Sequence, residues 1–246
     1  MSGRRMLATT RRVLSQLRHD KRTIGLMLGV PCLVMGLIAW MFSTRPGPPV
    51  IDRWGPMLLA IFPAIVMFLV TSVATLRERT GGTLERLMTT PLAKGDFLFG
   101  YAIAFAVAAT LQAVVVTGWA VWVCGMNVRG NLWELIIVAV LDAVLGSTMG
   151  LGASSLARTE FQAVQLMPAM IIPQLVVCGL FMPRSEMPAL LEWISNVVPF
   201  TYAMKATESI AGGGSLANSV GDVGIVVGFV ALALVAGVAT LKRRTA

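Results

Sequence analysis

The sequence predicts an all-α integral membrane protein with six transmembrane helices, and three observations lead to that fold class. Of the 246 residues, 56% are hydrophobic and only 13% are charged, and the mean hydropathy is +0.78. These proportions leave too little polar surface to cover a water-soluble globule of this size. Six apolar stretches are each long enough to cross about 30 Å of hydrocarbon, which takes about 20 helical residues. Residues 1–246 are therefore predicted to form one transmembrane domain.

The first predicted element is an amphipathic helix over residues 3–20, ahead of the first span. Its apolar residues lie on one half of a helical wheel and its arginines on the other half. The apolar half holds Met6, Leu7, Val13, Leu14 and Leu17, and the basic half holds Arg4, Arg5, Arg11, Arg12 and Arg18. We expect this helix to lie in the membrane interface, with its apolar side at the level of the lipid headgroups. A basic tail that only orients the first span is the alternative.

The predicted spans follow in order along the chain. They cover residues 23–43, 54–76, 101–126, 135–156, 161–182 and 223–241. A turn-forming run, Arg45-Pro46-Gly47-Pro48-Pro49, joins the first two spans into a helical hairpin. The repeats Gly146-x-x-x-Gly150 and Gly224-x-x-x-Gly228 predict places where two helices pack closely.

The positive charges indicate the orientation of these spans. Six crossings put both termini on one side, and fifteen of the twenty Lys and Arg residues lie on that side. The other five are Arg45, Arg53, Arg129, Arg184 and Lys205. Because Lys and Arg collect in cytoplasmic segments, both termini are predicted to be cytoplasmic. The predicted location is the plasma membrane of a bacterium. The bilayer then accounts for the net charge of +8 without nucleic acid.

Residues 184–210, on the outer side, form a predicted re-entrant helical segment. They include Leu190, Leu191, Trp193, Ile194, Val197 and Val198. So apolar a stretch is not expected to lie in water, and we expect it to turn back into the outer leaflet against protein.

The cytoplasmic loop after the second span is predicted to contain a short helix over residues 80–91. Thr83 is suited to cap it, and Leu84, Leu87 and Met88 share one of its faces. Apolar residues flanked by charges are typical of a helix that docks in a groove of a partner protein. A solvated linker is the alternative.

The same loop resembles the coupling segment of type-2 ABC exporter permeases, whose pattern is approximately RERExGTLExLxxTP. The run from Arg77 to Pro91 matches it except at Thr80, where that family usually has an acid. A second similarity resembles the family's outer segment and covers Gly179–Pro183, Met187–Pro188, Leu191, Ile194–Ser195 and Pro199–Tyr202. The similarity is strongest to the drug-resistance branch that includes daunorubicin exporter permeases.

This resemblance implies a six-helix subunit that works with a separate ATPase. Two ATPase copies would bind ATP and Mg, and a second permease, identical or related, would complete the pathway. The substrate would be hydrophobic or amphipathic: a drug, an antibiotic or a lipid-like molecule. The ATPase-coupling residues that the resemblance implies are Glu78, Arg79, Gly82, Thr83, Leu84, Glu85, Arg86, Leu87 and Met88.

The residues themselves argue against an enzyme in this chain. The sequence contains no GxxxxGK[ST] phosphate loop, and its single histidine, His19, excludes the usual zinc motifs and histidine-dependent triads. The three cysteines have no CxxC spacing, so no metal site and no catalytic residue is predicted. A secondary transporter or channel subunit remains the alternative to an ABC permease. An intramembrane enzyme ranks third.

Asp142 is the one ionisable residue deep within a predicted span. A charged residue at that depth costs roughly 2.5 to 3.5 kcal/mol unless it finds polar partners. Two interpretations stay open: a residue of the transport pathway, or a structural hydrogen bond to Gln112, Thr117 or Gln174. Asp142, Gln112 and Gln174 are therefore the candidate intramembrane polar residues.

Overall fold

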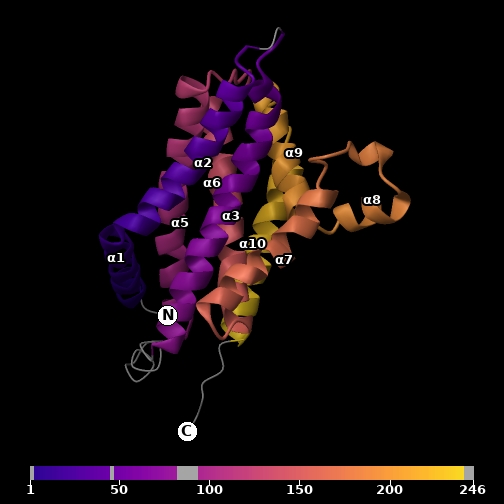
Figure 1. Ribbon diagram of the computed structural model, residues 1–246. Coiled ribbons are helices and arrows are strands. Elements are labelled where there is room, and N and C mark those ends of the chain that lie inside the picture. The colour runs from indigo at the N-terminus through magenta and orange to yellow at the C-terminus, as the bar shows by residue number, and fades with distance from the viewer. Residues whose placement is uncertain (1–2, 45–46, 82–93, 241–246) are drawn as a thin grey trace.

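The computed structural model describes residues 3–44, 47–81 and 94–240, and within them the chain is helical and has no strand. The helices are α1 (Gly3–His19), α2 (Lys21–Met41), α3 (Val50–Thr80), α5 (Lys94–Gly118), α6 (Leu132–Leu156), α7 (Glu160–Val177), α8 (Ala189–Ser195), α9 (Pro199–Ala211) and α10 (Val220–Thr240). A π-helical turn, η1 (Trp119–Val123), continues α5, and a short 3-10 turn, η2 (Arg184–Glu186), precedes α8. The long helices form one bundle (Figure 1).

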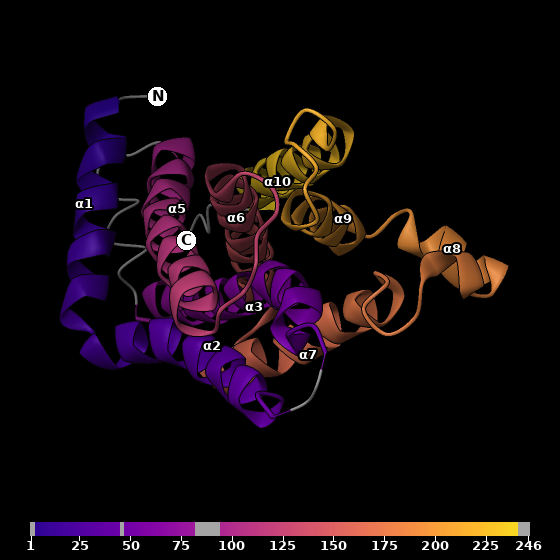
Figure 2. The same cartoon turned by 90° about the horizontal axis from the view of Figure 1, so that it is seen from above.

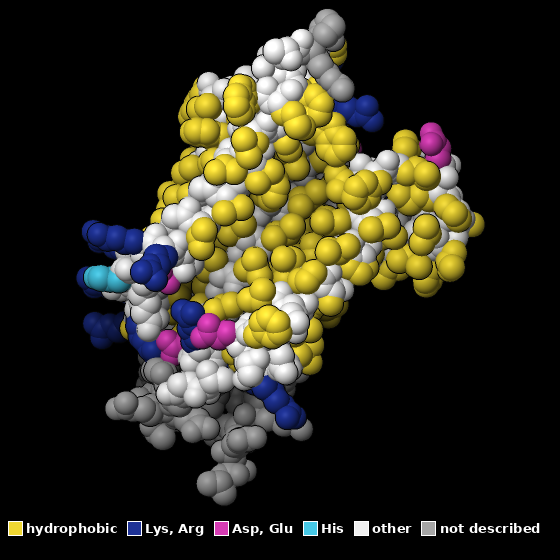
Figure 3. Space-filling model, viewed as in Figure 1, with side chains coloured by type: hydrophobic (Ala, Val, Ile, Leu, Met, Phe, Trp, Pro, Cys, Tyr) yellow, Lys and Arg dark blue, Asp and Glu magenta, His cyan; other side chains and the backbone are white. Residues whose placement is uncertain are grey.

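Five helices are long and apolar enough to cross a membrane: α2, α3, α5 with η1, α6 and α7. Their positions confirm five of the predicted spans as apolar helices. The sixth predicted span coincides with α10, which is not among these five helices in the described part of the chain, so the count of six stays a prediction. Hydrophobic side chains cover most of the visible flank of the bundle, and Lys and Arg gather near its lower end (Figure 3).

Helices α3 and α6 approach each other closely enough for their backbones to touch. A Cβ added to Gly146 would lie 2.0 Å from the carbonyl oxygen of Ala64, and one added to Gly150 would lie 2.4 Å from that of Phe68. Only glycine permits this approach of two backbones, so the first of the two glycine repeats packs as predicted. The second does not pack within the described chain, because Cβ atoms added to Gly224 and Gly228 would meet nothing within 4 Å.

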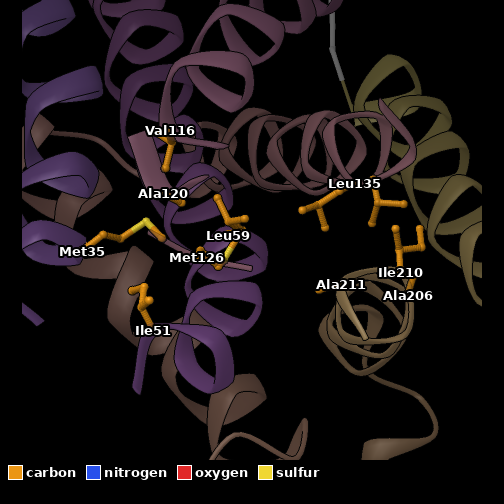
Figure 4. Packing of buried hydrophobic residues seen from close by; sticks show 11 residues of the cluster. Met35, Ile51, Leu59, Val116, Ala120, Met126, Leu135, Ala206, Ile210 and Ala211 are labelled. Carbon is orange, nitrogen blue, oxygen red and sulfur yellow. The ribbon is translucent and has the colours of Figure 1, made fainter. Parts of the chain in front are cut away.

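Helix α9 contributes directly to the core. Ala206 and Ile210 pack in one cluster with Leu135 of α6, Leu59 of α3 and Met35 of α2 (Figure 4). The predicted outer segment 184–210 is therefore two different structures. Its second half is buried in the bundle, whereas α8 extends sideways from it in both views (Figures 1 and 2), with Leu190 and Trp193 exposed.

Helix α1 contacts the rest of the protein with both its apolar half and its basic half, which was not predicted. It lies across the axis of the bundle (Figure 2) and packs along α5. Val13 is buried there, and Thr10 Oγ1 donates a hydrogen bond to the Gly100 carbonyl at 3.0 Å. Leu7 alone of the apolar set is largely exposed, and Arg12 turns inward. Most of the apolar side therefore packs against protein of the same chain, which a helical wheel does not distinguish from lipid. The place of α1 in the membrane interface stays a prediction.

A sharp turn at Asp20 joins α1 to α2. The Asp20 carboxylate accepts hydrogen bonds from the Thr23 backbone N–H at 3.1 Å and from Thr23 Oγ1 at 2.6 Å. It thereby caps α2. These bonds, the side-chain bond first, lower the pKa of Asp20.

Candidate functional site

Three consecutive residues at the end of α3 bind three different helices. Arg77 reaches Glu160 at the start of α7, Glu78 reaches α1, and Arg79 donates to the Ser154 carbonyl near the end of α6. Successive residues of an α-helix point about 100° apart, which is why one turn can face three neighbours. We call Arg77, Glu78 and Arg79, with these partners, the α3 junction.

The bond between Arg12 and Glu78 is the most enclosed ion pair of the α3 junction. Arg12 Nη2 lies 2.8 and 2.9 Å from the two Glu78 oxygens, and Gln16 Nε2 donates to the same carboxylate at 3.2 Å. The Glu78 side chain is only 11% exposed. The buried Tyr101 of α5 also interacts with Glu78. Several partners thus hold the Glu78 carboxylate in place. An exposed ion pair would be weakened by competition from water and by screening from salt.

The pair formed by Arg77 and Glu160 is more open to solvent. Arg77 Nε and Nη2 donate to the two Glu160 oxygens at 2.7 and 2.9 Å, in a bidentate arrangement. Both side chains are more than half exposed. Exposed pairs contribute about 0.2 to 1 kcal/mol, so this contact orients α7 more than it stabilises the fold.

Two of the predicted coupling residues, Glu78 and Arg79, belong to the α3 junction. The other seven, Gly82, Thr83, Leu84, Glu85, Arg86, Leu87 and Met88, lie outside the described residues, as does most of the predicted helix 80–91. Helix α3 continues through Thr80, so the junction directly precedes that segment. Sequence reasoning missed the partners Arg12, Gln16, Ser154 and Glu160, since no local pattern links residues this far apart in the chain.

We expect the Arg12–Glu78 bond to stabilise the fold measurably. The substitution Arg12→Gln should lower the free energy of unfolding by about 1 to 2 kcal/mol, because a charge-assisted bond to a mostly buried acid is lost. Arg11→Gln is the matched control, since Arg11 is exposed on the same helix and forms no ion pair among the described residues. Thermal unfolding in detergent measures both. Equal melting temperatures for the two variants would contradict the structural role of Arg12.

The candidate intramembrane polar residues do not meet. Asp142 is fully buried, and its Oδ2 lies 3.2 Å from Thr207 Oγ1 of α9. Gln112 donates to the Met27 carbonyl of α2 at 3.1 Å, and Gln174 donates to Met170 of its own helix at 2.8 Å. The predicted partners of Asp142 were wrong. Thr207 was overlooked because its segment was placed outside the bundle.

The single Thr207 hydroxyl proton is shared between the Asp142 carboxyl and the Ala203 carbonyl, whose oxygen lies 2.9 Å from Oγ1. Asp142 Oδ1 has no hydrogen-bond partner within the described part of the chain. Thr207 is therefore the one hydrogen-bond partner of this carboxyl among the described residues. The pair joins α6 to α9 inside the apolar core. It is a helix-to-helix bond and not a cluster that could bind a substrate by itself.

Removing the Thr207 hydroxyl should therefore be costly. Thr207→Val keeps the shape but leaves the Asp142 carboxyl unsatisfied, which we expect to cost about 1 to 3 kcal/mol. Thr201→Val is the control: Thr201 is buried on the same helix, and its hydroxyl has no partner in the described chain. Asp142→Asn should stay within about 1 kcal/mol of the unchanged protein, since an amide can still bond Thr207. If Thr207→Val and Thr201→Val melt at the same temperature, the bond is unimportant.

The chain is similar to known transporter proteins over most of its length. Residues 4–211 match the family described as ABC-2 type transporter. The "probable multidrug ABC transporter permease YbhR" of Escherichia coli is 30% identical over 153 residues, 61% of this chain and 42% of that protein. The "linearmycin resistance permease protein LnrN" of Bacillus subtilis is 27% identical over 68% of this chain and 43% of its own. "ABC transporter G family member 20" of Dictyostelium discoideum is 26% identical over 68% and 23%.

These matches cover less than half the length of each of these relatives. The family match, residues 4–211, nevertheless covers α1 from its second residue, all five long apolar helices and the α3 junction. With its apolar helices, the chain is a multi-pass membrane protein. It belongs to the ABC-2 type transporter family.

Proposed function

We propose that this chain is the membrane-spanning permease subunit of an ATP-binding-cassette exporter. It moves a hydrophobic or amphipathic substrate, such as a drug, an antibiotic or a lipid-like molecule, out of the cytoplasm. The α3 junction carries this proposal, because it connects the segment expected to meet an ATPase with three helices at once. The names of two relatives, a probable multidrug permease and a linearmycin resistance permease, support the substrate class.

The proposed assembly has two ATPase subunits, which bind ATP and Mg, and two permeases, this chain and an identical or related one. Each permease crosses the plasma membrane six times, with α10 as the sixth crossing and both termini in the cytoplasm. Helix α1 lies at the cytoplasmic surface, and of the segment 184–210 the part with α8 lies toward the outer side as the re-entrant element, while α9 belongs to the bundle. Residues 80–91 form the coupling helix that docks on the ATPase.

The α3 junction suggests how ATPase motion enters the bundle. A displacement of residues 82–88 acts first on the end of α3, and the bonds of Arg77, Glu78 and Arg79 then pass it to α7, α1 and α6. Glu78 and Arg79 are thus positioning residues, which act through their partners. The substrate need not touch them.

The decisive experiment is purification of the chain from its own cells under mild conditions. An ABC permease should copurify with an ATPase, and transport in vesicles should need ATP and stop with an ATPase inhibitor. A secondary transporter would instead move its substrate down an ion gradient without nucleotide. Transport that persists without ATP would overturn the proposal.

The proposed topology makes its own prediction. Cys32, Cys124 and Cys178 can be replaced by alanine, and a single cysteine introduced by Thr83→Cys. This cysteine should react with an impermeant thiol reagent only after the membrane is opened, because the distribution of positive residues predicts a cytoplasmic position for that loop. Asn127→Cys, in the loop predicted on the outer side, should react in intact cells. Reversed labelling would invert the topology and remove the basis for coupling through this loop.

A further inference from the structure

A groove of about 650 Å³ lies between α2 and α5. Its α2 side is formed by Gly25, Leu28, Gly29 and Leu33, and its α5 side by Val115 and, in η1, Trp119. A Cβ added to Gly25 or Gly29 would meet nothing within 4 Å, so the floor of the groove is open backbone. Glycine is less favourable than alanine inside a helix, and here no neighbouring helix among the described residues fills the space that it leaves.

The length of the groove fits one leaflet of a bilayer. From Gly25 to Leu33 the helix rises about 12 Å, close to half of the roughly 30 Å hydrocarbon core. The Trp119 side chain closes the end of the groove beyond Leu33, because its indole ring packs against α2 at Gly36. A Cβ added to Gly36 would lie 3.5 Å from the indole Nε1. A transmembrane helix of another subunit would continue across the full thickness, past this closure. An acyl chain of a single leaflet would not.

Positive residues stand at the open end of the groove. Helix α2 begins at Lys21, and Arg22 precedes Gly25 by three residues and Gly29 by seven, which places it on the groove face. Arg18, Lys21 and Arg22 are exposed, and none of them forms an ion pair with a described residue. The nearby acid, Asp20, is bonded through both oxygens to Thr23. Three exposed cations are therefore near in the sequence to one acid, and that acid is already engaged by Thr23.

We propose that this groove binds an anionic phospholipid of the leaflet next to α1. One acyl chain lies along Gly25, Gly29 and Leu33 beneath Trp119. The guanidinium of Arg22 donates to the phosphate, and Lys21 and Arg18 add charge attraction at the headgroup. The lipid covers a helix that the chain itself covers poorly, since only Met27, Pro31 and Met35 of α2 are buried. This inference does not depend on what the protein transports.

The test uses native mass spectrometry of the full chain, with any subunits that copurify, after adding equal amounts of phosphatidylglycerol and phosphatidylcholine with identical acyl chains. We expect one retained lipid per chain, predominantly phosphatidylglycerol. Arg22→Gln should lower the preference for phosphatidylglycerol roughly fivefold while some lipid remains bound. Gly29→Leu should remove retained lipid of both kinds, because the leucine occupies the floor of the groove.

Two controls match these variants. Arg11→Gln removes an exposed arginine of α1 farther from the groove mouth in the sequence, and Gly228→Leu places a leucine on an open glycine of α10. Both should retain lipid as the unchanged chain does. Gly25→Leu is the second groove variant if Gly29→Leu does not fold. The proposal is overturned if the groove variants retain as much lipid as Gly228→Leu, or if they change only the association between chains, which would make the groove a helix-docking site.

Discussion

The substitution Gly146→Val should prevent recovery of folded protein. A valine Cβ would lie about 2.0 Å from the Ala64 carbonyl oxygen, a distance that backbone atoms can relieve only by separating α3 from α6. Overpacking of side chains typically costs 1 to 3 kcal/mol, and a backbone obstacle leaves less room to adjust, so we expect about 3 kcal/mol or more. Size-exclusion chromatography in detergent should show loss of the folded species.

Gly152→Val provides the control for this prediction. Gly152 lies on the same helix, and a Cβ there would meet nothing within 4 Å, so the change in helix propensity is matched without the collision. We expect the control to fold. A folded Gly146→Val with an unchanged melting temperature would show that the α3–α6 crossing is looser than the structure indicates.

The second large effect is expected from Leu87→Asp, which should release the ATPase from the purified complex. If Leu87 is buried in a groove of the partner, its burial contributes about 1.5 to 3 kcal/mol, which is roughly ten- to a hundredfold in affinity. An aspartate there would add the cost of burying a charge. Pull-down of the complex measures the ATPase that remains bound.

Glu85→Ala is the contrasting variant. A charge at the rim of an interface contributes only about 0.2 to 1 kcal/mol, so the ATPase should stay mostly bound while stimulated hydrolysis and export decrease. If Leu87→Asp keeps both a full complement of ATPase and normal transport, residues 80–91 are a passive linker. The proposed route of coupling through the α3 junction would then fail as well.

The spans were predictable because a helix that crosses the bilayer needs an apolar stretch of a fixed minimum length. α2, α3, α6 and α7 lie within a few residues of the predicted ranges, apart from a longer α3. The glycine repeats show the limit of such reasoning, since the same spacing packs at Gly146 and stays open at Gly224. Spacing shows that a close approach is possible, and only the neighbouring helix decides whether it occurs.

The candidate site was predictable only in part. Glu78 and Arg79 were found through the local motif, but Arg12 was assigned to the outer face of an interfacial helix. Asp142 was correctly singled out as an isolated buried acid, whereas Thr207 was not considered as its partner. Both errors have one cause: apolar periodicity shows which side of a helix avoids water and is silent on which helix covers it.

The glycine crossing of α3 and α6 has a consequence for motion. Two helices whose backbones touch at Ala64 and Phe68 have no layer of side chains between them that could rearrange. Packed helix interfaces move by switching between discrete arrangements of their side chains. The α3–α6 interface has no second arrangement that keeps the backbone contacts at Ala64 and Phe68. We therefore expect α3 and α6 to move as one rigid body. Alternating exposure of a pathway would then arise from rotation of that body against α7 and the peripheral helices, with Arg77 and Glu160 at the pivot.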